Sequence, residues 1–320
     1  MWLTWRAATE RALYGEEGFY LRERPSGHFR TSVIASPAFA DAVLALLRQV
    51  DAELGEPAAL DLVDIGAGEG VLVTQVLAAA EPALRDRLRV TAVDLSPRPE
   101  GLPEQVVWRS GLPDAITGLA IANEWLDNVP LDVAEQTPDG PRLVMVDIGT
   151  GEERLGGPLR PPDRAWLDRW WPLSRVGSRA EIGRPRDRAW ASVVTRLTRG
   201  RAVAIDYAHP VDNRPLCGTL TGYRDGAVVT PIPDGTCDIT AHVALDACAE
   251  AGRRAGAIST TLSTQRDELR ALGITGARPP LELARTDPRA YLRALARATE
   301  ESELIDPSGL GGFGWLIQGR

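Results

Sequence analysis

The sequence has no lysine, so all 36 of its basic residues are arginine. With 44 acidic residues, the chain carries a formal net charge of −8. An acidic chain is not expected to coat nucleic acid, so we expect no nucleic-acid partner. The arginine-rich piece Arg184–Arg188 is interleaved with acidic residues, and we interpret it as solvated surface. We attribute the exclusive use of arginine to genomic base composition rather than to function.

Cysteine and histidine are scarce, with three residues of each. Cys217, Cys237 and Cys248 are odd in number and contain no CxxC pair, which argues against a disulfide framework and against a structural zinc site. His209 and His242 stand at irregular spacings from these cysteines. We therefore expect no bound metal.

Long apolar runs are also missing. No run approaches the roughly 18 residues that cross a bilayer, and residues 1–6 lack the basic start and apolar stretch of a signal peptide. We therefore expect a cytoplasmic protein without membrane insertion. The sequence does not indicate an oligomeric state.

What is present is an alternation of strands and helices along a chain of 320 residues. Apolar strand-like segments occur at 59–65, 89–95, 105–108, 118–122, 201–206, 257–262 and 314–318. Helical patterns occur at 1–14, 38–54, 71–80, 189–198, 238–251, 265–272 and 288–301. This order predicts parallel βαβ units in an α/β sandwich with a seven-stranded sheet.

Two regions interrupt this alternation. Residues 1–56 are predicted to form an N-terminal helical cap and loop, before a main domain at 57–320. Within that domain we predict an insertion at 131–188, which begins with a β-hairpin formed by 132–136 and 142–148. The rest of the insertion is interpreted as a lid, with its tryptophans Trp166, Trp170 and Trp171 packed in a core.

The stretch Leu62–Gly70, LVDIGAGEG, looks like a buried strand that runs into a glycine turn. A dinucleotide fingerprint has its third glycine at the position that Val71 occupies here. Glu69 lies beside the start of the following helix and would repel a pyrophosphate. The turn therefore favours a nucleotide without phosphates, such as S-adenosylmethionine, over a nicotinamide dinucleotide.

Two acidic residues support this interpretation. Asp64 precedes the turn, where its carboxylate can face the amine of the methionine part. Asp94 ends the second strand, where a carboxylate can accept hydrogen bonds from both ribose hydroxyls. The alternative for Asp94 is that it caps the next helix.

Several ordered segments resemble the MidA-type class I methyltransferases, a family that includes the mitochondrial complex I assembly-factor arginine methyltransferase. The matching segments are Gly18-Phe19-Tyr20, Gly27-His28-Phe29, LVDIGAGEGVL, Ile121–Pro130, Ala204–His209 and Asp238–Val243. The resemblance implies a Rossmann-like class I methyltransferase fold, S-adenosylmethionine as methyl donor and a protein arginine as acceptor.

The sequence departs from that family's usual pattern in four ways. Asn123 replaces a histidine, Ala67 replaces a proline, and His28 replaces an acid. The usual direct run into Thr-Ser-Pro is interrupted here, because residues 33–35 separate Thr31-Ser32 from Ser36-Pro37. Two alternatives therefore remain open for the acceptor and the activity: a small molecule methylated on oxygen or nitrogen, or a non-catalytic donor-binding assembly chaperone.

The candidate catalytic residues follow the fourth and fifth strands, where ligands bind in open α/β sheets. They are Asn123, Glu124, Asp127 and His209. Glu124 and Asp127 are three residues apart, so in a helical turn their carboxylates would share a face and clamp a guanidinium. His209 would act as a base or hydrogen-bond the substrate.

The candidate cofactor-binding residues gather at the same ends of the strands. They are Thr31, Ser32, Asp64, Gly66, Ala67, Gly68, Gly70, Asp94, Leu95, Gly111, Leu112 and Asn123. Within this set, Thr31 and Ser32 are expected to cover the carboxylate of the donor, and Gly111 and Leu112 to flank the adenine. Tyr207 and His28 are the candidate substrate-binding residues, and His242 is expected on a helix packed against the sheet.

Overall fold

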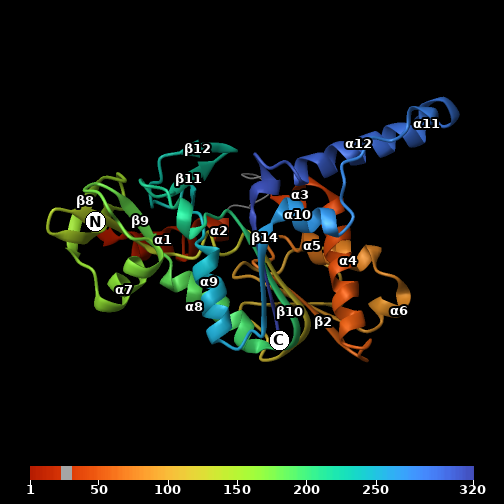
Figure 1. Cartoon of the computed structure of the whole chain (residues 1–320), viewed down its shortest axis with the longest axis horizontal. Helices are drawn as coiled ribbons and strands as arrows, with labels where there is room; N and C mark the ends of the chain where they lie inside the picture. The colour runs from red at the N-terminus through yellow and green to blue at the C-terminus, as the bar shows by residue number, and fades with distance from the viewer. Residues whose placement is uncertain (23–30) are drawn as a thin grey trace.

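A seven-stranded sheet forms the centre of the computed structural model, which describes residues 1–22 and 31–320 (Figure 1). Its order is β14-β15-β10-β5-β2-β3-β4. The strands are β2 (Leu60–Ile65), β3 (Leu88–Val93), β4 (Val106–Arg109), β5 (Ile116–Asn123), β10 (Leu197–Asp206), β14 (Ser259–Thr264) and β15 (Gly314–Gly319). Six of the seven strands run in the same direction, and β15 runs antiparallel to both of its neighbours. The predicted seven-stranded, mostly parallel sheet is confirmed.

The central strands are apolar on both faces because helices cover both sides of the sheet. Along β2, Leu60 and Leu62 point into one core, whereas Val63 and Ile65 point into the other. The first core is closed by α4 (Pro37–Glu53), α5 (Val71–Ala79) and α10 (Gln265–Ala271). The second is closed by α8 (Arg184–Arg196) and α9 (Leu245–Arg254). The result is a three-layer sandwich.

The predicted hairpin is present and belongs to a second, antiparallel sheet. The hairpin consists of β6 (Asp132–Thr137) and β7 (Gly140–Asp147), which pair with β1 (Trp2–Thr4), β8 (Glu153–Pro158) and β9 (Arg179–Ile182). Trp166 and Trp171, on and just after α7 (Pro161–Trp170), are buried against this sheet. The tryptophan-rich stretch therefore builds the core of the second sheet.

The N-terminal region packs against both sheets. Helix α1 (Trp5–Tyr14) shares a core with β6 and β7, whereas α4 packs on the large sheet. The short helices α2 (Phe19–Arg22) and α3 (Ser32–Ala35) lie between α1 and α4 in sequence. The domain boundaries at 1–56, 57–320 and 131–188 stay predictions.

The predicted helix at 238–251 is wrong in its first half. Residues Asp238–Thr240 form β13, which pairs with β11 (Thr221–Arg224), and β11 pairs in turn with β12 (Ala227–Val229). Helix α9 begins only at Leu245, so His242 lies before the helix and not on it. The pairing with β11 overrides the helical appearance of the alanine-rich sequence that follows.

The remaining helices are α6 (Pro82–Arg85), α11 (Leu281–Thr286) and α12 (Pro288–Leu304). Figure 1 shows α12 running outward from the body, with α11 at its tip. None of the described helices has both the length and the apolar composition that crossing a bilayer would need. Among the described residues, no group of three or more His, Cys, Asp or Glu side chains is arranged to hold a metal ion.

Candidate functional site

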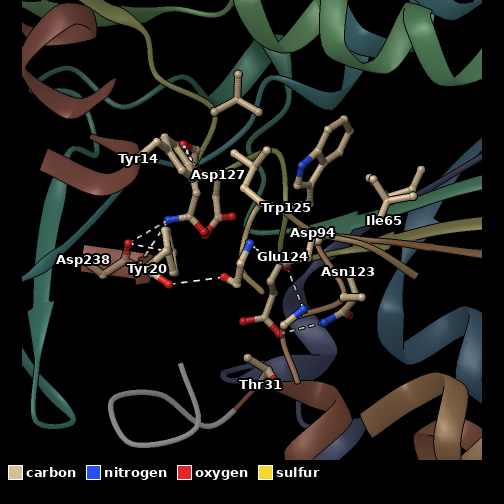
Figure 2. Close-up of a pocket in the computed structure, with 18 of the residues that line it drawn as sticks. Tyr14, Tyr20, Thr31, Ile65, Asp94, Asn123, Glu124, Trp125, Asp127 and Asp238 are labelled. Atoms are coloured by element: carbon tan, nitrogen blue, oxygen red, sulfur yellow. Dashed lines mark hydrogen bonds between the residues drawn. The ribbon is translucent and has the colours of Figure 1, made fainter. Parts of the chain in front are cut away.

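A cavity of about 1710 Å³ opens where β2, β3, β4, β5 and β10 reach their carboxyl ends. The predicted residues that line it are Thr31, Asp64, Gly66, Ala67, Gly68, Asp94, Leu95, Gly111, Leu112, Asn123, Glu124, Asp127 and Tyr207. Gly70, Ser32 and His209 do not line it. His28 lies outside the described residues. Figure 2 shows part of this wall, with Asp94, Asn123 and Glu124 together near its centre.

The glycine turn has a backbone that only glycine adopts easily. Gly66, Gly68 and Gly70 have φ angles of 72°, 56° and 71°, in the left-handed region. A Cβ on Gly66 would lie 2.9 Å from the Trp125 ring, and a Cβ on Gly70 would lie 2.5 Å from a methyl carbon of Leu102. Gly70 is therefore needed for packing at the start of α5, whereas Gly68 faces open space in the cavity.

Asp94 fixes this turn from the end of β3. Its Oδ2 accepts a hydrogen bond from the Gly68 N–H at 2.8 Å, and its Oδ1 accepts one from the Ser96 N–H at 2.8 Å. Each carboxylate oxygen keeps a further lone pair for a donor that enters the cavity. The next residue, Leu95, lines the cavity with 60% of its surface exposed. An apolar surface of this kind can cover an aromatic base.

Asp64 is a buried acid that has no hydrogen-bond partner in the described part of the chain. Its side chain is 4% exposed and makes no hydrogen bond to any described residue. Burial, reinforced by the nearby charge of Asp94, raises the pKa of Asp64 to about 7. A cation placed in this part of the cavity would stabilise the ionised carboxylate.

Glu124 stands at the other side of the turn with a strained backbone. Its φ angle is 51°, and its N–H donates to the Ile205 carbonyl at 2.8 Å. Its Oε1 accepts from the Asn123 side-chain amide at 3.1 Å (Figure 2) and from the Ser32 N–H, also at 3.1 Å. Its Oε2 has no hydrogen-bond partner among the described residues. Burial, with a contribution from the charge of Asp127, raises the pKa of Glu124 to about 8.

Ser32 hydrogen-bonds to Glu124 and does not line the cavity. Its amide is bonded to Glu124, and its hydroxyl donates to Gln265 Oε1 at 3.0 Å in the core. The expectation that Ser32 covers the donor carboxylate is therefore corrected, because neither of its donors is available. Thr31 does line the cavity.

Asp127 does not share a helical turn with Glu124, because residues 124–130 form an irregular loop. Its side chain is 5% exposed. Oδ2 accepts from the Thr240 hydroxyl at 2.7 Å, whereas Oδ1 is buried without a partner. Burial raises the pKa of Asp127, and the Thr240 hydroxyl and the charge of Arg186 oppose that rise. The predicted helical clamp is thus replaced by two acids on an extended loop.

The wall beyond Asp127 was not identified from the sequence. Tyr20 donates its hydroxyl to Asp238 at 2.9 Å, Asn128 donates its amide to the same carboxylate at 3.0 Å, and Tyr14 donates to the Asn128 carbonyl at 3.1 Å. The two tyrosine rings stack with centroids 5.6 Å apart. Of the five tyrosines in the chain, four line the cavity, at positions 14, 20, 207 and 223. This concentration could be recognised only after folding.

His209 is placed away from the cavity, contrary to the predicted catalytic role. Its Nδ1 lies 2.6 Å from an Arg214 nitrogen, and its ring packs edge-on against Trp171 at 4.4 Å between centroids. Burial, followed by the charge of Arg214, lowers the pKa of His209 to about 3. The imidazole is therefore a neutral packing group. Tyr207 does line the cavity, with its ring 4.1 Å from that of Phe313 between centroids.

The interpretation of Arg184–Arg188 as solvated surface is wrong for Arg186, whose side chain is 2% exposed. Asp206, at the end of β10, is also fully buried. Its Oδ2 accepts from the N–H groups of Leu126 and Asp127, at 2.9 and 3.2 Å. Both buried side chains contact the loop that carries Glu124 and Asp127.

Comparisons with known proteins agree with this geometry. A family model described as "Putative S-adenosyl-L-methionine-dependent methyltransferase" matches residues 39–263. A crystal structure from Burkholderia thailandensis bound to S-adenosyl-homocysteine is similar, with 27% identity, a TM-score of 0.83, and coverage of 100% of this chain and 88% of that chain. A native crystal structure from the same organism shows 28% identity, a TM-score of 0.82, and coverage of 100% and 87%. None of the curated proteins matches this chain in sequence.

The family model spans well over half of the chain, and both similar structures cover all of it. The fold is that of the class I methyltransferases, with the sheet and the glycine turn that the sequence predicted. The chain belongs to this family and is an S-adenosylmethionine-dependent methyltransferase.

Proposed function

We propose that the protein transfers the methyl group of S-adenosylmethionine to a guanidinium nitrogen of an arginine in a protein acceptor. The observation that carries this proposal is the unpartnered Oε2 of Glu124, which faces the cavity next to the donor end. Asp127 adds a second buried acid whose Oδ1 has no partner. Two carboxylates at one end of a cavity suit a planar cation with several N–H donors.

The donor end has groups that fit the three parts of S-adenosylmethionine. Asp64 would hold the ammonium, Asp94 the ribose hydroxyls, and Leu95 with Gly111 and Leu112 the adenine. Thr31 lies near the position proposed for the methionine carboxylate. When bound, S-adenosylmethionine supplies a methyl group that is already activated on a cationic sulfur. The residues of the chain therefore have to position the acceptor and exclude water.

Glu124 has two tasks in this proposal. Hydrogen bonds from Ser32 and Asn123 fix one of its oxygens, so the other can orient the acceptor nitrogen. A guanidinium nitrogen must also lose a proton when it gains a methyl group. A carboxylate whose pKa is about 8 in the empty cavity is suited to accept that proton near neutral pH.

The size of the cavity supports a protein acceptor over a small molecule. Small-molecule sites usually occupy about 300–1,000 Å³. The present cavity is about 1710 Å³ and extends from the donor end past Asp127 to Tyr14, Tyr20 and Tyr223. The additional volume can take the chain that carries the arginine. The MidA-type resemblance points to the same acceptor.

The test combines donor binding with methyl transfer. Calorimetric titration with S-adenosylmethionine, and with NAD as a control ligand, should show saturable binding of the first alone. Transfer of a radioactive methyl group to arginine-containing peptides should then fall by about 10²–10⁴-fold in Glu124→Gln, the usual contribution of a general base. Donor affinity should change less than about threefold, because Glu124 is outside the proposed donor contacts.

Glu104→Gln is the matched control, because Glu104 is exposed and does not line the cavity. Unchanged transfer in Glu124→Gln would remove Glu124 from the mechanism. Donor binding without transfer to any arginine peptide would favour a different acceptor or the assembly chaperone.

A further inference from the structure

Helix α8 brings one arginine into the interior directly after the second sheet. β9 ends at Ile182 and α8 begins at Arg184, so Arg186 lies in the first turn of the helix. Its two arginine neighbours in sequence are more exposed: Arg184 pairs with Asp163 at 2.5 Å, and Arg188 faces solvent. The Arg186 side chain, by contrast, is 2% exposed.

The Arg186 guanidinium donates to four backbone carbonyls. Two belong to the loop after β5, at Asp127 and, at 3.4 Å, at Val129. The other two belong to the segment between β13 and α9, at Ala241 (2.9 Å) and His242 (2.8 Å). Arg186 makes no ion pair with any residue in the described ranges. Arg186 therefore connects two backbone segments, and no carboxylate in the described ranges contacts its guanidinium.

A buried acid holds the same loop from the other side. Asp206 accepts from the N–H groups of Leu126 and Asp127, and the Glu124 N–H donates to the neighbouring Ile205 carbonyl. The loop thus donates N–H groups to the Asp206 carboxyl group and accepts hydrogen bonds from the Arg186 guanidinium at its carbonyls. Burying a charge is costly unless polar groups satisfy it, and for the Arg186 guanidinium the backbone carbonyls do so. These contacts together stabilise the strained backbone conformation of Glu124.

The charge of Arg186 also acts on the titratable groups around it. Those that interact with its charge come from α1, the loop after β5, β9, β10, α9, and the segments before α9 and after β10: Tyr14, Asp127, Glu181, Asp206, Cys248, His242 and His209. Burial raises the pKa of Asp127, Glu181 and Asp206, and the Arg186 charge acts against that rise. A neutral side chain at this position would leave these acids more easily protonated.

We propose that Arg186 is a positioning residue: its four carbonyl contacts fix the loop carrying Glu124 and Asp127, and its charge favours the ionised form of Asp127. Its place in methyl transfer rests on the function proposed above. In this proposal the second sheet helps to position Arg186, because its strand β9 leads directly into the first turn of α8.

Hydrogen exchange tests the four carbonyl contacts of Arg186 without any methyl acceptor. Arg186→Met removes the charge and the donors, Arg186→Lys keeps the charge but loses the planar five-donor guanidinium, and Arg184→Met is the matched control on the same helix turn. In Arg186→Met, amides at 124–129 and 241–243 should exchange about tenfold faster or more, as expected when several hydrogen bonds are lost. Exchange in β2 and β3 and donor affinity by calorimetry should stay within about threefold of wild type.

Arg186→Lys should show the same local change to a smaller extent, which keeps the test valid if Arg186→Met unfolds. Unchanged exchange at 124–129, or an equal increase across β2 and β3, would overturn the proposal. Because hydrogen exchange needs no methyl acceptor, it tests the role of Arg186 even if the protein does not methylate arginine.

The second readout is the pH dependence of thermal unfolding. Without the Arg186 charge, the neighbouring acids and histidines bind protons more readily in the folded state. Stability of Arg186→Met should therefore fall relative to wild type as the pH rises from about 6 to 8.

The control variant Arg184→Met should differ in stability from wild type by a constant amount over this range. For its partner Asp163, burial raises the pKa, but the hydrogen bonds from Arg184 and Arg160 outweigh that rise and leave the pKa lowered. A constant difference for Arg186→Met would contradict the electrostatic part of the proposal.

Discussion

The two ends of the cavity are built in different ways. The donor end comes mainly from the ends of three neighbouring strands: Asp64 lies near the end of β2 and the glycine turn follows it, Asp94 follows β3, and Gly111 with Leu112 follows β4. The acceptor end collects Tyr14, Thr240 and the loop after β5 from segments far apart in the chain. A short sequence motif can encode a site that recognises one constant ligand. A site that recognises a variable partner is assembled by the fold, and it depends on packing at several places.

The sharpest test of this division is Asp94→Ala. It removes the carboxylate proposed to bind the ribose and also the acceptor for the Gly68 N–H. Donor affinity should fall by about 100-fold or more, since hydrogen bonds to charged groups contribute about 1.5–3 kcal/mol each. Calorimetric titration with S-adenosylmethionine measures this, with the exposed Asp86→Ala as control. A loss below about threefold would remove Asp94 from the donor end.

The same division explains what the sequence could predict. The seven strands, the glycine turn and the position of Asp94 follow from local patterns, because each is contained in a few consecutive residues. The arrangement around Thr240 was missed because Asp238–Thr240 precedes an alanine-rich helix, and only pairing with β11 makes it a strand. Arg186 was missed because the pattern RPRDR does not show which arginine is buried. That depends on the carbonyls that the fold brings to it.

Asp64 gives a pH-dependent test of the donor end. Its pKa of about 7 means that it is largely protonated below pH 7 in the free protein. If its anion binds the donor ammonium, donor affinity should rise with pH between about 6 and 8, by up to about tenfold per pH unit on the acidic side. In Asp64→Asn the affinity should be lower and independent of pH over this range. A wild-type affinity that is flat from pH 6 to 8 would contradict this role.

The glycines of the turn should separate stability from binding. Gly70→Ala puts a side chain at φ 71° against Leu102 and should cost about 1–2 kcal/mol of unfolding free energy. Its donor affinity should be nearly unchanged, because Gly70 does not line the cavity. Gly68→Ala points its methyl group into the cavity and should weaken donor binding more than Gly70→Ala does. Denaturant unfolding and calorimetry on both variants give the comparison, and the reverse order would refute it.

Asp238 provides the smallest expected effect, at the acceptor end. Burial, with a contribution from the Asp127 charge, raises the pKa of Asp238 to about 7. The folded state therefore binds a proton that the unfolded chain releases at lower pH, and this stability is lost as the pH rises through about 7. Asp238→Asn should flatten the dependence of the unfolding temperature on pH between 5 and 8 and leave donor affinity unchanged. An unaltered slope would show that Asp238 is already ionised in the folded protein.

Trp125 lies where the two ends of the cavity meet. Its ring packs against Gly66 of the turn, its backbone follows Glu124, and the residue lines the cavity (Figure 2). An indole in this position is an internal optical probe, since its emission depends on the polarity around the ring. Occupation of the cavity should change the intrinsic fluorescence, and the change should disappear in Trp125→Phe. The enzyme can then be followed without a label, and the arrival of donor and acceptor can be timed separately.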